Sequence, residues 1–156
     1  MGKNALAVAQ KILDVSHELG DPSVTPMQLL KLVYIAHGYM LGKHSTPLLD
    51  KPVQAWQYGP VEPSVYDAVR KYRSMPVQEV ANAPRLEFSE DELDVIRTVV
   101  RKYGKVDGLT LSAATHQSGT PWSVTWGLNG RNSEISNDLI ENFYRRLLSQ
   151  PRHSSL

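Results

Sequence analysis

A chain of 156 residues is long enough to bury one hydrophobic core, so a single domain is expected. Its 17 Lys and Arg residues are balanced by 16 Asp and Glu residues, which gives no support for a nucleic acid or a membrane surface as partner. The absence of cysteine excludes disulfides and thiolate chemistry, and no apolar run approaches the roughly 18 residues that span a bilayer. Without a signal-peptide pattern, we expect a soluble cytoplasmic domain.

The first two predicted helices cover residues 4–19 and 26–41. In the first, apolar side chains recur at helical spacing. The second begins with three agreeing signals, because Thr25 can cap it, Pro26 stands where no amide is needed, and Gln28 can complete a capping box. The start of the second helix is therefore defined by residues next to each other in the sequence.

The helix over 26–41 is apolar on most of its circumference, which indicates a central, buried element. Lys31 and His37 are its conspicuous polar residues. We interpret His37 as a partly buried imidazole that is hydrogen-bonded to the backbone, and this interpretation is favoured over a general base.

A short strand is predicted over residues 52–58, where side chains alternate until Gly59 and Pro60 break the pattern. The equally short segment 85–88 is the candidate partner strand. Between the two, Pro63 opens another helix. The sequence thus predicts one small two-stranded β element.

Four further helices complete the chain. One begins at a capping box on Ser89 and ends at Gly104, and shorter ones cover 109–117 and follow Pro121. Ser136 caps the last. The other segments are predicted to be loops or a frayed end: 74–84, 127–133 and 151–156. The expected fold is mainly α, a compact domain over residues 1–150 with about seven helices.

Residues 54–66 are the most informative stretch, with aromatic side chains, a Gly-Pro turn and a second proline close together. Such a dense arrangement indicates a fixed surface for holding a partner, because Trp and Tyr anchor protein interfaces. We expect Trp56 and Trp122 to be mainly structural. The side chains expected at the surface are Lys31, Tyr34, Tyr58, Val61 and Glu62.

The sequence gives little support for a catalytic site or a metal site. The five histidines form no HxxxH pair and have no acidic ligand at a suitable interval, so no metal site is expected. His116 follows Ser112 by four residues, but no Gly-x-Ser-x-Gly elbow is present and capping chemistry explains the pair better. The Gly-Asn segment at 127–131 is predicted to be a turn rather than a phosphate-binding loop.

Basic clusters occur at 70–73 and at 145–146. Acidic residues lie near each in the sequence, so solvated helix faces are predicted rather than a phosphate track. A helix-turn-helix could be drawn through 93–117, but its second helix offers almost no base-reading side chain. Nucleic acid is therefore not the expected partner.

Four motifs, in order over residues 5–148, resemble the Panacea domain family, which includes SocA-like antitoxins and phage-associated GepA-like proteins. The matching segments are Leu29 to Gly38, Ala55 to Val61 with Tyr66, Leu111-Ser112 to His116 with Pro121-Trp122, and Ile135 to Ile140. The resemblance implies a non-enzymatic antitoxin that needs no cofactor and binds a cognate toxin directly. For the SocA type it also implies an adaptor that delivers the toxin to the ClpXP protease.

On this basis the partner-binding surface is assigned to the helix at 26–41 and the strand and turn at 53–66. Its candidate residues are Lys31, Tyr34, His37, Trp56, Tyr58, Gly59, Pro60, Val61, Glu62 and Tyr66. A structural motif is assigned to His116, Pro121 and Trp122. The competing hypotheses are a hydrolase or transferase that uses His37 or His116, and a phage-encoded regulatory or DNA-binding protein without an antitoxin role.

Overall fold

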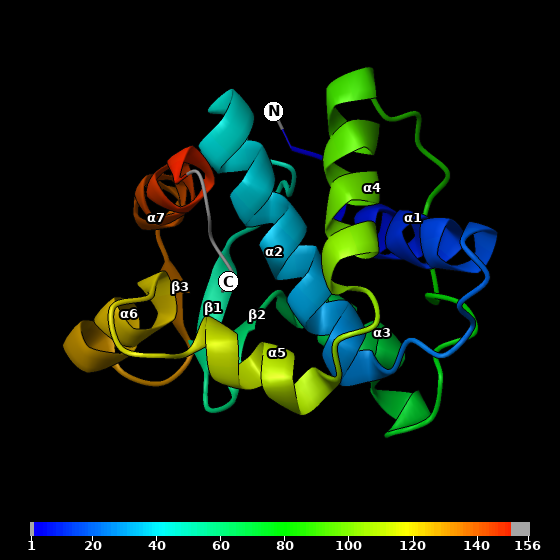
Figure 1. The fold of residues 1–156 in the computed structure, drawn as a ribbon. Coiled ribbons are helices and arrows are strands. Elements are labelled where there is room, and N and C mark those ends of the chain that lie inside the picture. The colour runs from blue at the N-terminus through cyan, green and yellow to red at the C-terminus, as the bar shows by residue number, and fades with distance from the viewer. Residues whose placement is uncertain (1, 151–156) are drawn as a thin grey trace.

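The computed structural model describes residues 2–150, which form seven α-helices, one 3-10 helix and a three-stranded sheet (Figure 1). In chain order they are α1 (Ala5–Glu18), α2 (Pro26–His44), β1 (Val53–Trp56), β2 (Gly59–Val61), α3 (Pro63–Val69), η1 (Arg70–Tyr72), α4 (Glu90–Tyr103), α5 (Gly108–Thr115), α6 (Pro121–Asn129), β3 (Ser133–Ile135) and α7 (Asn137–Ser149). The fold is mainly α, as predicted. Within the described residues, every helix is too short or too polar to cross a lipid bilayer.

Helix α2 is the centre of the fold, with α4 and α7 on either side of it (Figure 1). It also contacts α1, α3, α5 and β2, and nearly all of its side chains up to Leu41 are buried. Its start confirms the predicted signals, because Thr25 and Gln28 form a capping box around Pro26. The apolar circumference of this segment is thus explained by neighbours on all sides.

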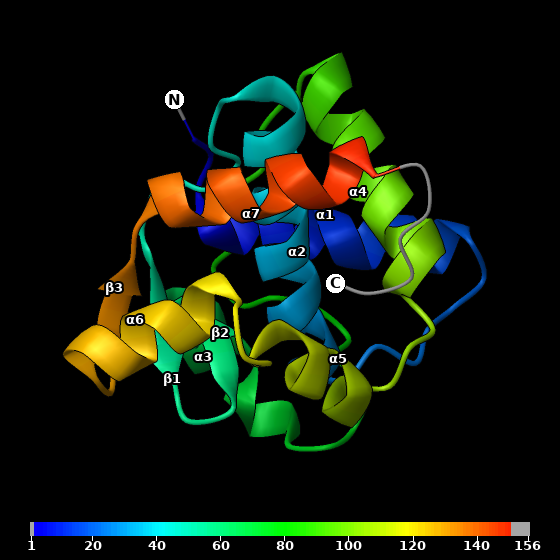
Figure 2. The same cartoon turned by 60° about the vertical axis from the view of Figure 1, so that its left-hand side comes forward.

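The close crossing of α2 and α7 depends on glycine (Figure 2). A Cβ atom at Gly38 would lie 2.3 Å from the ring of Tyr144, and one at Gly42 would lie 2.8 Å from the Tyr144 backbone. The Tyr144 ring in turn packs edge-on against Tyr34, with ring centroids 6.0 Å apart. Two glycines one turn apart on the same face of α2 therefore make room for Tyr144, a fully buried aromatic of α7.

The sheet differs from the prediction. Strand β1 pairs antiparallel with both β2 and β3, in the order β2-β1-β3, so three strands are present. The predicted partner at 85–88 forms no strand, and that prediction is wrong. The chain instead turns back at once over Gln57 and Tyr58, because Gly59 adopts the positive φ of 119° that its position in the hairpin requires.

The region near β3 was also predicted wrongly. Helix α6 continues through Gly127 to Asn129, and Ser133 already belongs to β3. The glycine did not end the helix because its backbone keeps helical geometry, with open space where a side chain would stand. By contrast, the caps at Ser89 and Ser136 and the loop over 74–84 are confirmed. The frayed end predicted at 151–156 lies outside the described residues.

Candidate functional site

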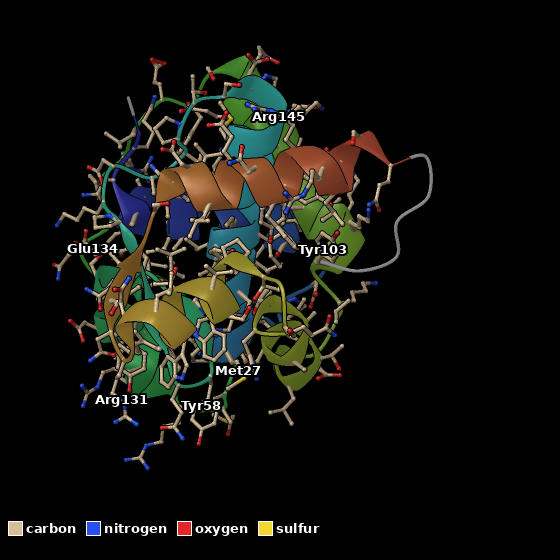
Figure 3. All side chains as sticks on the ribbon, turned by 90° about the vertical axis from the view of Figure 1, so that its left-hand side faces the viewer. Met27, Tyr58, Tyr103, Arg131, Glu134 and Arg145 are labelled. Atoms are coloured by element: carbon tan, nitrogen blue, oxygen red, sulfur yellow. The ribbon has the colours of Figure 1, made fainter. Side chains whose placement is uncertain are left out.

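A groove of about 550 Å³ opens between the first turn of α2, the β1–β2 hairpin, α3 and the loop before β3. Its walls are mostly apolar and come from Met27 and Leu30 on α2, from Trp56 and Val61 on the hairpin, and from Tyr66 on α3. Met27, Tyr58 and Arg131 mark its position at one end of the molecule, opposite Arg145 (Figure 3).

The hairpin beside this groove is held by three helices. The backbone carbonyls of residues 56, 58 and 60 each accept a hydrogen bond from a different helix. The donors are Trp122 Nε1 on α6 at 2.6 Å, the Ser112 hydroxyl on α5, and Lys31 Nζ on α2 at 3.0 Å. One carbonyl of β1, one of the turn and one of β2 are thus held, so the tip of the hairpin is fixed on both sides of the turn.

Glycine at position 59 is needed for this attachment. A Cβ atom there would lie 3.0 Å from Lys31 Nζ and 3.3 Å from Thr115 Oγ1, and the φ of 119° already disfavours any side chain. The hairpin can therefore approach α2 and α5 closely only with glycine in the sequence.

Lys31 lies at the base of the groove and is only 2% exposed. Its one hydrogen bond goes to the Pro60 carbonyl, and no carboxylate of the described residues pairs with it. Burial alone lowers the pKa of Lys31 from 10.5 to about 7. An ammonium in this position weakens the fold, which is the pattern expected where a residue serves function rather than stability.

Aromatic side chains form the opposite wall. Trp56 packs edge-on against Tyr66 with ring centroids 5.0 Å apart, and its Nε1 donates to Gln54 Oε1 at 2.9 Å. The guanidinium of Arg70 lies over the Tyr66 ring, 5.8 Å from its centroid. Tyr58, at the turn, leaves 63% of its surface exposed. The result is a fixed aromatic wall, with the exposed Tyr58 ring at its end.

Three exposed arginines, Arg70, Arg73 and Arg131, also line the groove. None of them forms an ion pair with another described residue. No Asp or Glu is among the groove-lining residues. The site therefore combines apolar walls with positive charge that the groove itself does not neutralise.

Comparison with known proteins identifies the family. The profile of the family described as "Antitoxin SocA-like, Panacea domain" matches residues 29–123, which include Lys31, the hairpin, Ser112 and Trp122. The chain belongs to the SocA-like antitoxin family. It is similar to Antitoxin SocA of Caulobacter vibrioides (strain NA1000 / CB15N), with 31% identity over 134 residues, 78% of this chain and 69% of the relative. No solved structure matches the chain.

The predicted exposure of this SocA-like chain is confirmed only for Tyr58. Lys31, Tyr34, Val61 and Glu62 are each less than 5% exposed, so those four predictions are wrong. The first two are buried because α2 is surrounded by other elements. Glu62 is buried because it caps α3, where its carboxylate accepts from the Val65 amide at 3.1 Å and from the Ser64 hydroxyl.

Ten residues were predicted to bind the partner of the SocA-like antitoxin, and the structure divides them into two groups. Five line the groove: Lys31, Trp56, Tyr58, Val61 and Tyr66. The other five lie behind it or elsewhere in the core: Tyr34, His37, Gly59, Pro60 and Glu62. The first group borders the groove, although Lys31 and Val61 within it are themselves less than 5% exposed.

His37 is hydrogen-bonded to the backbone, as predicted, but it is fully buried where partial burial was expected. Its Nδ1 accepts from the amides of Leu48 and Leu49 at 3.3 and 3.2 Å, and its Nε2 donates to Asn137 Oδ1 at 3.0 Å. Burial lowers the pKa of His37 to about 4, despite the hydrogen bond to Asn137. The ring is therefore neutral and joins α2 to the following loop and to the start of α7.

The Ser112 and His116 side chains support the hairpin instead of each other. Ser112 donates its hydroxyl proton to the Tyr58 carbonyl, and His116 Nδ1 donates to the Ser112 carbonyl. The His116 ring packs edge-on against Trp122, with centroids 5.2 Å apart, and Pro121 begins α6 beside it. This geometry does not place a base on the serine hydroxyl, as a nucleophile would need.

Sequence reasoning missed several groove residues, namely Met27, Leu30, Arg70, Arg73, Arg131 and Asn132. Four of them lie on or just after helices, and the sequence assigned Met27 and Leu30 to a buried helix and the two arginines at 70 and 73 to a solvated face. A usable signal was the spacing of Met27 and Leu30 from Lys31, which places all three on one face of α2. Arg131 gave no such signal, since its place depends on the pairing of β3 with β1.

Proposed function

We propose that this chain is an antitoxin that neutralises a toxin protein by direct binding, without catalysis, and that it does so in the cytoplasm. Membership of the SocA-like antitoxin family supports the role. The observation that carries the binding site is the clamped hairpin, in which donors from three helices hold alternate carbonyls while Tyr58 stays exposed.

A rigid hairpin favours binding for a physical reason. Association costs free energy for every side chain and loop that must be ordered, so a surface that is already fixed loses less. Tyr58 offers a large ring with few rotatable bonds, which is typical of residues that dominate interface energies. The groove beside it provides an apolar depression that can receive side chains from the partner.

The enzymatic alternative receives no support from the two histidines that it would use. Both ring nitrogens of His37 are engaged inside the core, and His116 Nδ1 is bound to a backbone carbonyl. A general base needs a nitrogen within reach of a substrate proton. The arrangement of His37 favours support of the fold, and that of His116 favours support of the hairpin.

Co-expression tests the proposal. The candidate toxin is the product of a neighbouring reading frame that arrests growth when expressed alone, and this chain should restore growth and co-purify with it. Tyr58→Ala should lose most of the protection while keeping the wild-type melting temperature. Leu19→Ala is the matched control, because Leu19 is also exposed, at 51%, but ends α1 away from the groove.

Two results would count against the proposal. Full protection by a folded Tyr58→Ala variant would reject this surface, and failure of the wild-type chain to bind or neutralise any toxin would reject the antitoxin role. Delivery of the toxin to a ClpXP-type protease is a separate prediction from the family resemblance. It would be measured as a shorter toxin half-life when this chain and the protease are both present.

A further inference from the structure

We propose that the groove binds an acidic segment of the toxin, with a carboxylate against the Lys31 ammonium and a neighbouring apolar side chain against the aromatic wall. This inference rests on the proposed antitoxin function and adds to it the chemistry of the bound segment. It is carried by the groove's charge, by the environment of Lys31 and by the apolar walls.

The charge of the groove differs from that of the whole chain. The chain is almost balanced, with 17 basic and 16 acidic side chains, yet the groove gathers one lysine and three arginines and no acid. The arginines Arg70, Arg73 and Arg131 come from two distant parts of the sequence and meet only in the fold. Opposite charge on the partner would complement this surface, and like charge would be excluded from it.

Lys31 has donor capacity that the fold does not use. An ammonium group has three N–H donors, and among the described residues the Lys31 ammonium donates one hydrogen bond, to the Pro60 carbonyl. A carboxylate at the base of the groove would accept from the remaining donors and supply the negative charge that the site lacks. Such a charge-assisted hydrogen bond is strengthened by the low dielectric of a buried position.

The walls require that the bound segment also be partly apolar. Met27, Leu30 and Trp56 would stay in contact with water if an isolated carboxylate were the only occupant. A volume of about 550 Å³ is large enough for several connected groups rather than a single ion. An Asp or Glu next to an apolar or aromatic residue fits both the charge and the walls.

A nucleotide or a nucleic acid fits less well. Phosphate sites commonly use free backbone amides at a helix N-terminus or a glycine-rich loop. At the start of α2, Pro26 has no amide proton and the Gln28 amide already donates to Thr25 Oγ1. The positive groups that remain are side chains at the rim and a single lysine beneath apolar walls, which suits a peptide carboxylate.

The test compares binding of the intact toxin to four forms of the antitoxin. We expect Lys31→Met, and separately the double variant Arg70→Ser with Arg73→Ser, to lower affinity at least tenfold by calorimetry. Arg97→Ser on α4 is the control that removes the same single charge as Lys31→Met, and it should bind as wild type, because Arg97 is exposed and lies outside the groove. Circular dichroism monitors folding, and the two rim arginines are exposed, so their loss leaves the core intact.

Removal of the acid then identifies the bound segment. Overlapping toxin peptides are screened by fluorescence anisotropy, and the one that binds should contain Asp or Glu. Replacing that acid by its amide in the intact toxin should lower the affinity for wild type at least tenfold but change the affinity for Lys31→Met little, because that variant has already lost the contact.

The outcomes separate the two proposals. If the intact toxin binds and is neutralised, but the Lys31 and arginine variants bind it as tightly as wild type, the acidic-segment inference is overturned and the antitoxin function stands. If the wild-type chain binds no toxin, the antitoxin function itself fails. Displacement of bound toxin by a 20-nucleotide single strand at physiological salt would overturn the inference in favour of nucleic acid.

Discussion

At the scale of single residues, Lys31 shows a conflict between stability and binding. Its ammonium is buried without an acidic partner, and burial lowers its pKa from 10.5 to about 7. A shift of this size corresponds to about 5 kcal/mol of unfavourable free energy for the charged form. The hydrogen bond to the Pro60 carbonyl offsets only part of that cost, since a hydrogen bond that involves a charged group contributes about 1.5–3 kcal/mol.

We therefore predict that Lys31→Met raises the free energy of unfolding at pH 6–7 by about 2–3 kcal/mol, while it lowers toxin affinity. In the wild type, the unfolded state holds the Lys31 proton up to about pH 10.5 and the folded state releases it near pH 7. Wild-type stability should thus rise between these values, and the advantage of the methionine variant should shrink. Urea unfolding at pH 6.5 and pH 9.5 measures both effects.

A methionine variant that is less stable than wild type at pH 6.5 would contradict this account. In that case the bond between Lys31 and Pro60 would outweigh the cost of burial, and the residue would be explained by the fold alone.

At the scale of elements, the crossing of α2 and α7 is set by the glycines of α2. We predict that Gly38→Ala lowers the free energy of unfolding by about 1–3 kcal/mol, because its Cβ would lie 2.3 Å from the Tyr144 ring. This loss should exceed the gain of about 1 kcal/mol that alanine brings to a helix interior. Thermal melting provides the measurement.

Gly127→Ala is the matched control for this prediction. Gly127 also lies within a helix, α6, but no atom would contact a Cβ placed there within 4 Å. The control should leave the melting temperature unchanged or raise it slightly. Equal gains in the two variants would show that helix propensity, rather than the contact with Tyr144, decides the result.

The hairpin clamp gives a second prediction at this scale. Trp122→Phe keeps an aromatic ring but removes the Nε1 donor to the Trp56 carbonyl, at a cost of about 1–3 kcal/mol. Amide hydrogens of β1 and β2 should then exchange faster, and toxin affinity should fall. Trp126→Phe is the control, because it keeps a ring on the stacked Trp122 and removes no bond to the hairpin. Unchanged hairpin exchange in Trp122→Phe would contradict the clamp.

The elements that the sequence predicts well are those whose ends depend on neighbours in the chain. Thr25 with Gln28 and Ser89 with Glu92 both form the expected capping boxes, because each needs only residues three positions apart. The strand pairing failed for the opposite reason. The second strand begins with Gly59 and Pro60, which read as breakers, and the third pairs Val53 with Ile135 from the other end of the chain.

At the scale of the whole molecule, the groove could be predicted only in part. Trp56, Tyr58 and Tyr66 were identified because they lie within one short segment. The positive rim was not, since Arg70 and Arg131 are far apart in sequence and each has acids among its neighbours along the chain. Lys31 was identified but placed at the surface, because a single lysine in an apolar helix does not reveal whether a partner or the core surrounds it.

The exposed arginines and the buried lysine of the groove should act on different steps of toxin binding. Arg70, Arg73 and Arg131 are exposed, so they attract an acidic partner through solvent and are screened by salt, whereas Lys31 acts only after contact. We predict that Arg73→Ser lowers mainly the association rate and weakens its dependence on salt. Lys31→Met should instead raise the dissociation rate about tenfold or more, because the carboxylate loses a partner that water cannot replace in the groove.

Biolayer interferometry at 50 and 300 mM NaCl separates these effects, with Arg97→Ser as the control. The overall charge of the chain is only +1, so any steering must come from the local cluster, and equal effects of Arg97→Ser and Arg73→Ser on association would rule that cluster out.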